Sequence, residues 1–475
     1  MECTTKKFFT RSRFSRREIL SIGTAGMLAA GFAPKVARAA DVQTKKRSPS
    51  AGTLAQDIET ALAALDKDKL VKLAMDLVNI PSPLGREEET ARFLHGLFQE
   101  VGLYSSLQPF APGRCNVLGV HEGSGGGRRL MLNGHLETGG SEQDGAFPPC
   151  RIIDNEWISG RGIWNMKGTI AAYVAAIMAV QKSGIPLAGD VLIAGGAGAW
   201  DESPVATRLK GEPYQGYGVG IKHMLAHGGV ADLAVVGEPT SFKLVRQHFG
   251  ITLVRIDISS ELSEPRIIDD LTGDLTRFMR KPSDASAFRY DVIGYAAEIV
   301  QALNAWIPDY IRRNIVEGVP PLVSVSAIEG GQPWRPGSSD RCSIFISVGT
   351  PPQALPTAVL DEMRQVLAKV RGTYPRLSAH AELYAVNPGP FVPEGSPIVA
   401  SLRAAHSDIF GRDPDEVVVQ WYSDASPLVR YGIPSLNYGP SGKASAEGES
   451  VRVSDLMNCA RVYIDLIVRV CGEPA

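Results

Sequence analysis

Apolar residues recur at intervals of three and four soon after residue 50, which is the spacing of an amphipathic helix. The pattern covers residues 54–80 and predicts one helix or a pair of helices. It should end before Pro81, because a proline disfavours helical backbone at the residue before it. After a turn-rich break, residues 87–103 show the same spacing, with Ala91 and Phe98 on the inner face. We therefore expect helices at the start of the folded chain.

Short apolar runs then replace the helical spacing, and such runs are typical of strands buried in a sheet. One further helix is predicted among them, over residues 167–182. Strands that alternate with helices favour an α/β fold, in which ligands bind beyond the ends of the strands. The predicted strands are 116–120, 130–132, 190–194 and 232–236.

From residue 248 the pattern reads strand, helix, strand, strand, helix, strand, which is the order of a ferredoxin-like α+β sandwich. We expect residues 248–384 to form a second domain, inserted into a first one made of residues 50–247 and 385–475. Pro308 should end or kink the first helix of the insertion. The predicted elements of the insertion are strands 251–258, 322–328 and 342–348 and helices 292–307 and 356–370; strands 417–420 and 434–438 should then rejoin the first sheet.

Residues 1–39 have the features of an export signal. Arg16 and Arg17 lie in the run SRREIL, which resembles a twin-arginine motif, and an apolar run at 22–33 is followed by the small-residue cleavage site Ala37-Arg38-Ala39. The apolar run is too short to span a bilayer as a stable helix. We therefore expect a periplasmic protein, exported by the twin-arginine route, with no stable membrane anchor after the signal is removed.

The composition narrows the function only slightly. The chain has 475 residues, of which 44% are hydrophobic and 21% charged, and its net charge is −2. This balance gives no reason to expect a nucleic-acid partner, so we expect a small-molecule substrate held in a pocket. Five cysteines follow the signal, and no CxxC pair is present. A cysteine zinc site is therefore not expected, at least one thiol should be free, and the pairing of the others is open.

One stretch, residues 128–140, carries the first candidate chemistry. His135 and Glu137 follow a predicted buried strand and stand two residues apart, so that in extended backbone both side chains point the same way. This spacing suits a metal-binding histidine with a carboxylate that orients its ring. The alternative is that both residues face solvent at the end of a strand.

Several segments together resemble the co-catalytic zinc hydrolases that include acetylornithine deacetylase, succinyl-diaminopimelate desuccinylase, aminoacylase and glutamate carboxypeptidase. They occur in the order of that family and read NIPSPLGREEETARFL, GRCNVLG, LMLNGHLET, ISGRGIWNMKGTIAAYVAA, ADLAVVGEPT and DASPLVRYGIPSLNYGPSG. The resemblance implies a zinc-peptidase-like α/β catalytic domain with an inserted ferredoxin-like lid. It also implies two zinc ions that activate a water, a glutamate that moves the proton, and dimerisation through the lid.

The resemblance assigns roles to individual positions of this sequence. His135 matches the first zinc-binding histidine, and Glu137 stands where an aspartate usually orients that ring. Asn165 occupies the position of the bridging aspartate, and Glu238 matches a ligand of the first metal. A neutral amide offsets the repulsion between two close cations less well than a carboxylate does. We therefore expect at most one metal ion, held by His135, Glu238 and Asn165, although one or two ions are usual for the family. Zinc is expected, with cobalt or manganese as alternatives.

The second half of the implied site departs further from the family. After the strand at 190–194 the family has a pair of glutamates, one the base and one a ligand. Asp201 and Glu202 form that pair in one alignment; in another, Glu202 keeps the position of the base and Ser203 replaces the ligand. The late histidine of the family is missing, and Ser445 takes its place. Two hypotheses follow: a hydrolase that cleaves an amide bond of an N-acyl amino acid or small peptide, or a pseudoenzyme that binds such a ligand without cleaving it.

Four further residues have competing interpretations. His248 is either a substrate contact near the lid hinge or a structural histidine, and Arg341 either binds a substrate carboxylate or is an exposed structural residue. His223 and His227 stand four apart on a predicted helix, a spacing that can bind metal, but surface histidines are the favoured interpretation. The edge strand of the lid and helix 292–307 are the expected homodimer surface.

Overall fold

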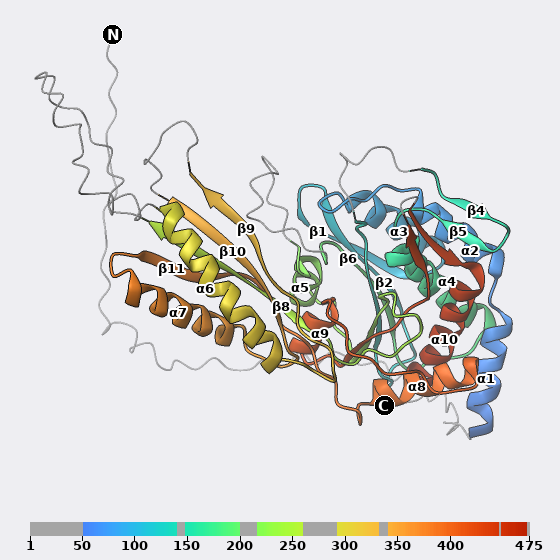
Figure 1. Cartoon of the computed structure of the whole chain (residues 1–475). Helices are drawn as coiled ribbons and strands as arrows, with labels where there is room; N and C mark the ends of the chain where they lie inside the picture. Colours follow the sequence, from blue (N-terminus) through green and yellow to red (C-terminus); the bar gives the residue numbers. More distant parts are fainter. Residues whose placement is uncertain are drawn as a thin grey trace, which may run out of the picture. The chain divides into compact units, whose positions relative to one another are not determined.

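A mixed six-stranded sheet forms the centre of this computed structural model, which describes residues 51–139, 148–199, 216–259, 292–331, 341–445 and 448–472 (Figure 1). Strands β6, β3, β7 and β12 run parallel, and β2 and β1 extend the sheet antiparallel. The predicted α/β fold class is confirmed. In spatial order the strands are β1 (Tyr104–Ala111), β2 (Arg114–His121), β6 (Val191–Gly196), β3 (Leu130–His135), β7 (Leu233–Val236) and β12 (Ser435–Asn437).

Helices cover both faces of this sheet, and its central strands β6, β3 and β7 are therefore buried on both sides. Leu130 and Leu132 of β3 belong to a core shared with one layer of helices, whereas Met131 belongs to a second core on the other face. The first layer contains α1 (Ala51–Ala63), α2 (Lys67–Val78), α3 (Glu88–Glu100), α4 (Gly168–Ser183), α8 (Pro397–Phe410) and α10 (Val453–Cys471); the second contains α5 (Val219–Ala226) and α9 (Ala425–Arg430).

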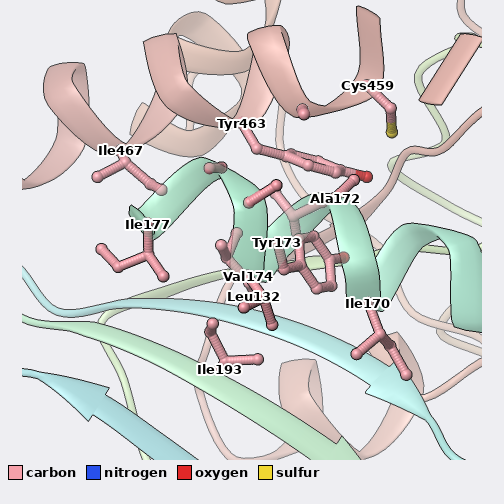
Figure 2. Close-up of a cluster of buried hydrophobic side chains, with 14 of the residues drawn as sticks. Leu132, Ile170, Ala172, Tyr173, Val174, Ile177, Ile193, Cys459, Tyr463 and Ile467 are labelled. Atoms are coloured by element: carbon pink, nitrogen blue, oxygen red, sulfur yellow. The ribbon is translucent and has the colours of Figure 1, made fainter. Parts of the chain in front are cut away.

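Helix α4 lies between the sheet and α10 and is buried on almost all sides (Figure 2). Tyr173 and Tyr463 meet where α4 and α10 pack, with ring centroids 4.6 Å apart. Within the described residues, Ile163–Ser183 is the one helical stretch with the length and apolar composition of a membrane span, and most of it is enclosed by this core. All five cysteines after the predicted signal are buried and free.

A second, four-stranded antiparallel sheet is formed by the segment between Gly250 and Asn387, which we call the lid. Its spatial order, β11-β8-β10-β9, has the ferredoxin-like arrangement, and helices α6 and α7 pack on it around a separate apolar core. The domain boundaries at residues 248 and 384 stay a prediction. The lid comprises β8 (Gly250–Ser259), α6 (Val292–Arg313), β9 (Val323–Gly330), β10 (Arg341–Thr350), α7 (Pro356–Thr373) and β11 (Ser378–Asn387).

Two predicted features are wrong in detail. Helix α6 does not end at Pro308 but runs on to Arg313, and the alternative of a kink at Pro308 stays a prediction. Polar contacts around its last turn support this: Tyr310 donates to Gly349 O and Arg313 pairs with Glu362. The segment at 417–420 is not a strand of the first sheet, because it forms only isolated bridges, such as His248 with Val419.

A third sheet was not predicted at all. Its four strands are three to five residues long and come from distant parts of the sequence, so no local pattern marks them. This sheet places the strands that precede Asn165, the predicted bridging position, next to the strands around Ser445, the predicted position of the late histidine. Its order is β13 (Lys443–Ser445), β14 (Gly448–Arg452), β5 (Trp157–Ser159) and β4 (Arg151–Ile153).

Candidate active site

The carboxyl ends of neighbouring parallel strands bring the predicted site residues together. Strand β3 extends three residues beyond its predicted end and finishes at His135, and Glu238 follows directly after β7. Both side chains are buried. Glycines beside them allow α4 to approach closely: a Cβ at Gly134 would lie 2.7 Å from Ile170 Cγ1. The strand ends and α4 therefore enclose a polar cluster within the core of the fold.

His135 is held at both ring nitrogens. Its Nδ1 lies 2.9 Å from the backbone oxygen of Glu137, and its Nε2 lies 2.9 Å from Oδ1 of Asn165. Both partners are carbonyl oxygens, so a ring nitrogen that carries a hydrogen can donate to the oxygen beside it. Burial lowers the pKa of His135, but the carboxylates of Glu137 and Glu238 and the bond to Asn165 outweigh it and raise this pKa above its usual value.

Glu137 connects two strand ends. Its buried carboxylate accepts hydrogen bonds from the backbone N–H groups of Gly198, at 2.9 Å, and Ala199, at 2.5 Å, just after β6. Its backbone oxygen is the acceptor for His135. Glu137 therefore orients the histidine through its main chain and positions the turn after β6 through its side chain.

Asn165 lies in a short irregular turn, η2 (Ile163–Lys167), at the start of α4. Glu449 fixes this turn, because its Oε2 accepts the N–H groups of Trp164 and Asn165 at 3.0 and 3.1 Å. Burial raises the pKa of Glu449, and the hydrogen bonds that its carboxylate accepts from backbone N–H groups offset part of this rise. Glu449 was not among the predicted site residues, and Ser445, which should replace the late histidine, lies nearby in β13.

Asp424 is a second residue that the sequence did not reveal. It lies at the start of α9, only 2% exposed, and its Oδ1 has no hydrogen-bond partner within the described ranges. Burial raises the pKa of Asp424 to about 7, with Glu137 and Glu238 adding to the effect. Burial likewise raises the pKa of Glu238. The one available signal was its segment, DASPLVR, in which an acid precedes an apolar helix.

The remaining predicted residues lie outside this cluster. His248 is buried, with Nδ1 2.7 Å from Phe249 O and Nε2 3.0 Å from Ser423 Oγ, and burial lowers its pKa to about 4. Arg341 is exposed at the first position of β10. His227 stacks on His223 at the surface, with ring centroids 3.9 Å apart. The predicted acidic pair at Asp201 and Glu202 lies outside the described residues, as does the predicted signal.

A pocket of about 490 Å³ opens beside the cluster. Asn165 and Glu238 line it from the side of the six-stranded sheet, and the lid lines it from the other side. A volume of a few hundred cubic ångströms is typical of small-molecule sites. The lid contributes Gly250, Ile251, Leu322, Ser347 and Gly349, and the remaining residues of the wall include Trp164, Pro239, Gln420, Trp421 and Tyr422.

The described residues do not fit a two-metal centre. Among them, no three His, Cys, Asp or Glu side chains are close enough together to hold a metal ion. The Nε2 atom of His135, which a metal would need, lies 2.9 Å from Oδ1 of Asn165. The predicted roles of His135, Asn165 and Glu238 as ligands therefore stay predictions.

The sequence matches the family described as Peptidase family M20/M25/M40 over residues 131–469. The chain belongs to this family, whose members are metallohydrolases acting on amide bonds. It is 25% identical to N-formyl-4-amino-5-aminomethyl-2-methylpyrimidine deformylase from Halalkalibacterium halodurans, over 87% of this chain and 97% of that protein. It is also 25% identical to succinyl-diaminopimelate desuccinylase from Gluconacetobacter diazotrophicus, over 84% and 96% of the two chains.

Solved structures show the same fold. The aminopeptidase PepT from Bacillus cereus superposes with a TM-score of 0.62 at 16% identity, covering 86% of this chain and 99% of that one. A peptidase from Bacillus subtilis, described as binding a dinuclear metal, superposes with a TM-score of 0.57 at 14% identity, covering 85% and 98%. The likeness confirms the predicted family architecture.

Proposed function

We propose that the protein hydrolyses the amide bond of a small N-acyl compound bound in the 490 Å³ pocket. The observation that carries this proposal is the position of Asn165 and Glu238, which line the pocket on the same side as the buried His135. Membership of an amide-hydrolase family supports it, as do relatives named deformylase and desuccinylase. The predicted substrates, N-acyl amino acids and small peptides, fall within this class.

The residues of this chain have separate tasks in such a reaction. Glu238 lies at the pocket wall, where burial raises the pKa of its carboxyl group. Glu137 positions the ring of His135 through its own backbone oxygen, and Glu449 positions Asn165 by accepting its backbone N–H. Asp201 and Glu202 remain our candidates for the general base, by analogy with the family.

A second candidate function is binding of the same ligand without hydrolysis. The hydrogen bond between His135 Nε2 and Asn165 Oδ1 favours it, because it engages the nitrogen that a ligand role requires. Asparagine at this position also removes a negative charge that would hold two cations together.

We further propose that the protein is exported to the periplasm and forms a homodimer through the lid. The twin-arginine-like run SRREIL supports the first point. The second is supported by β9, which is an edge strand of the lid sheet and exposes Ile328.

The two candidate functions are separated by measuring amine release from formyl, acetyl and succinyl amides and the metal content of the same purified protein. We expect turnover of at least one amide and no more than one metal ion per chain. His135→Ala should abolish turnover, whereas His227→Ala, at an exposed position, should leave it unchanged. Binding without turnover would favour the second candidate, and two ions per chain would contradict the assignment of Asn165.

A further inference from the structure

Two large apolar side chains in the pocket wall are only partly covered. Leu322, from the lid, is 61% exposed, and Trp421, from the segment before α9, is 36% exposed, although both line the pocket. Glu238, just after β7, is only 8% exposed. Leu322 and Trp421 therefore mark the mouth of the pocket, and the end of β7 marks its inner part. We call these two side chains the mouth pair.

The backbone around Leu322 is held from two sides. The N–H group of Gly349 donates to the backbone oxygen of Leu322 at 2.6 Å, which ties this segment to β10. From outside the lid, the side-chain amide of Gln420 donates to the backbone oxygen of Pro320 at 2.8 Å. The second bond joins the segment before Leu322 to the residue before Trp421, so the two members of the mouth pair lie on neighbouring segments.

Trp421 is held in place as well. Its ring lies near the buried ring of His248, with centroids 5.8 Å apart. Two positions earlier, the backbone oxygen of Val419 accepts the N–H group of Phe249 at 3.0 Å. Groups that are ordered before a ligand arrives lose little further freedom when it binds, and this favours affinity. The mouth pair is therefore a preformed apolar surface.

We propose that the mouth pair determines specificity by holding an apolar arm of the substrate. The amide lies in the inner part of the pocket, and a chain of several carbons extends from it to Leu322 and Trp421. A chain that covers these side chains removes apolar surface from water on both partners, which favours binding. The pocket therefore prefers N-acyl compounds with such a chain over short ones, whether the chain belongs to the acyl or to the amine part. The inference rests on the proposed function, since it names the substrate class of the same site.

Three uncharged amides test this preference. N-hexylacetamide and N-ethylhexanamide are isomers, and each extends N-ethylacetamide by the same number of methylenes, on the amine and on the acyl part respectively. Binding to the purified full chain is measured by calorimetry, and amine release is followed separately. A fully buried methylene increases affinity by about fourfold. We expect at least one isomer to bind about tenfold or more tightly than N-ethylacetamide, which requires the burial of roughly half of the added chain.

Variants assign the preference to the mouth pair. Leu322→Ala and Trp421→Ala should each lower the ratio of the two affinities by at least about twofold, because each removes apolar surface that the chain contacts. Trp421→Phe keeps a large apolar ring and should retain most of the ratio. Leu355→Ala, at an exposed lid position outside the pocket wall, is the matched control and should leave the ratio unchanged.

The outcomes separate the substrate class from the activity. Equal affinities for all three amides, or a ratio that neither alanine variant changes, would overturn the inference even if amine is released. Tighter binding of a long-chain isomer that depends on the mouth pair, without amine release from any ligand, would keep the substrate class and remove hydrolysis from the proposed function.

Discussion

The two sides of the pocket bury different kinds of side chain. Within the described residues, every buried carboxylate, lysine, arginine and histidine lies outside Gly250–Asn387. The lid core is built from aliphatic and aromatic residues together with Cys342 and Met363. Its ion pairs, such as Arg255 with Glu382, lie at the partly exposed surface.

This difference indicates a division of tasks between the two regions. Burying a charge costs free energy unless the charge is paired, so a fold tolerates many buried charges only where they are supported by hydrogen bonds. The region around the six-stranded sheet provides that support to His135 and Glu137 and places them beside the pocket. The lid contributes shape and apolar area.

The strongest test of this contrast is the buried ion pair of Arg114 with Glu87. The guanidinium contacts both carboxylate oxygens, at 2.9 and 3.1 Å, and both side chains are almost fully buried. Arg114→Met should lower the free energy of unfolding by about 3–5 kcal/mol, because it leaves a buried acid without its partner. Urea denaturation measures the change.

The matched lid variant is Arg255→Met, whose side chain is 32% exposed. It should cost less than about 1 kcal/mol, as is usual for ion pairs near the surface. Equal losses for the two variants would contradict the proposed difference between the regions.

His248 gives a pH-dependent test at the boundary of the two regions. Its pKa is about 4 in the folded protein against an ordinary value of 6.5, because burial disfavours the charged ring. As the pH falls, the unfolded chain takes up the proton first, so stability from this group is complete above pH 6.5 and is lost towards pH 4. The 2.5-unit difference corresponds to roughly 3 kcal/mol.

His248→Gln should therefore abolish the part of the stability loss at acidic pH that is due to His248. The difference in unfolding free energy between the variant and the unmodified protein is measured from pH 8 to pH 4. The raised pKa of Asp424 favours the folded state at low pH, which is the opposite effect. Because both proteins contain Asp424, its contribution cancels in the difference. A difference that stays constant over this range would show that His248 is not buried in its neutral form.

Most of the fold was predictable because its elements have local signatures. The apolar run of β3 and the spacing along the helices are visible in consecutive residues, and the lid order follows from the succession of such patterns. The short strands β14 and β5 were missed because they pair with each other across almost 300 residues of sequence.

The site shows the same limit. His135 was found because it stands at the end of an apolar run, which is a local pattern, and Glu238 was found through the family resemblance of its segment. Glu449 and Asp424 were missed because their importance arises from distant partners: Glu449 holds the turn at Asn165, 284 positions away, and Asp424 meets the buried acids only in the folded chain.

The smallest expected effect concerns an apolar side chain of the lid that lines the pocket. It tests the apolar half of the difference between the lid and the region around the six-stranded sheet. Leu322 is 61% exposed and lines the pocket, whereas Leu355 is 63% exposed in the lid and is not part of the wall. Leu322→Ala should change the unfolding free energy by less than about 0.5 kcal/mol, because most of the side chain is already hydrated. It should weaken binding of an acetyl amide in the pocket by roughly fivefold, because about 1 kcal/mol of apolar contact is lost. Leu355→Ala should change neither the unfolding free energy nor the affinity. Calorimetry compares the affinities of the two variants. A loss confined to Leu322→Ala would show that the lid contributes to ligand binding, whereas equal affinities of the two variants would show that it does not.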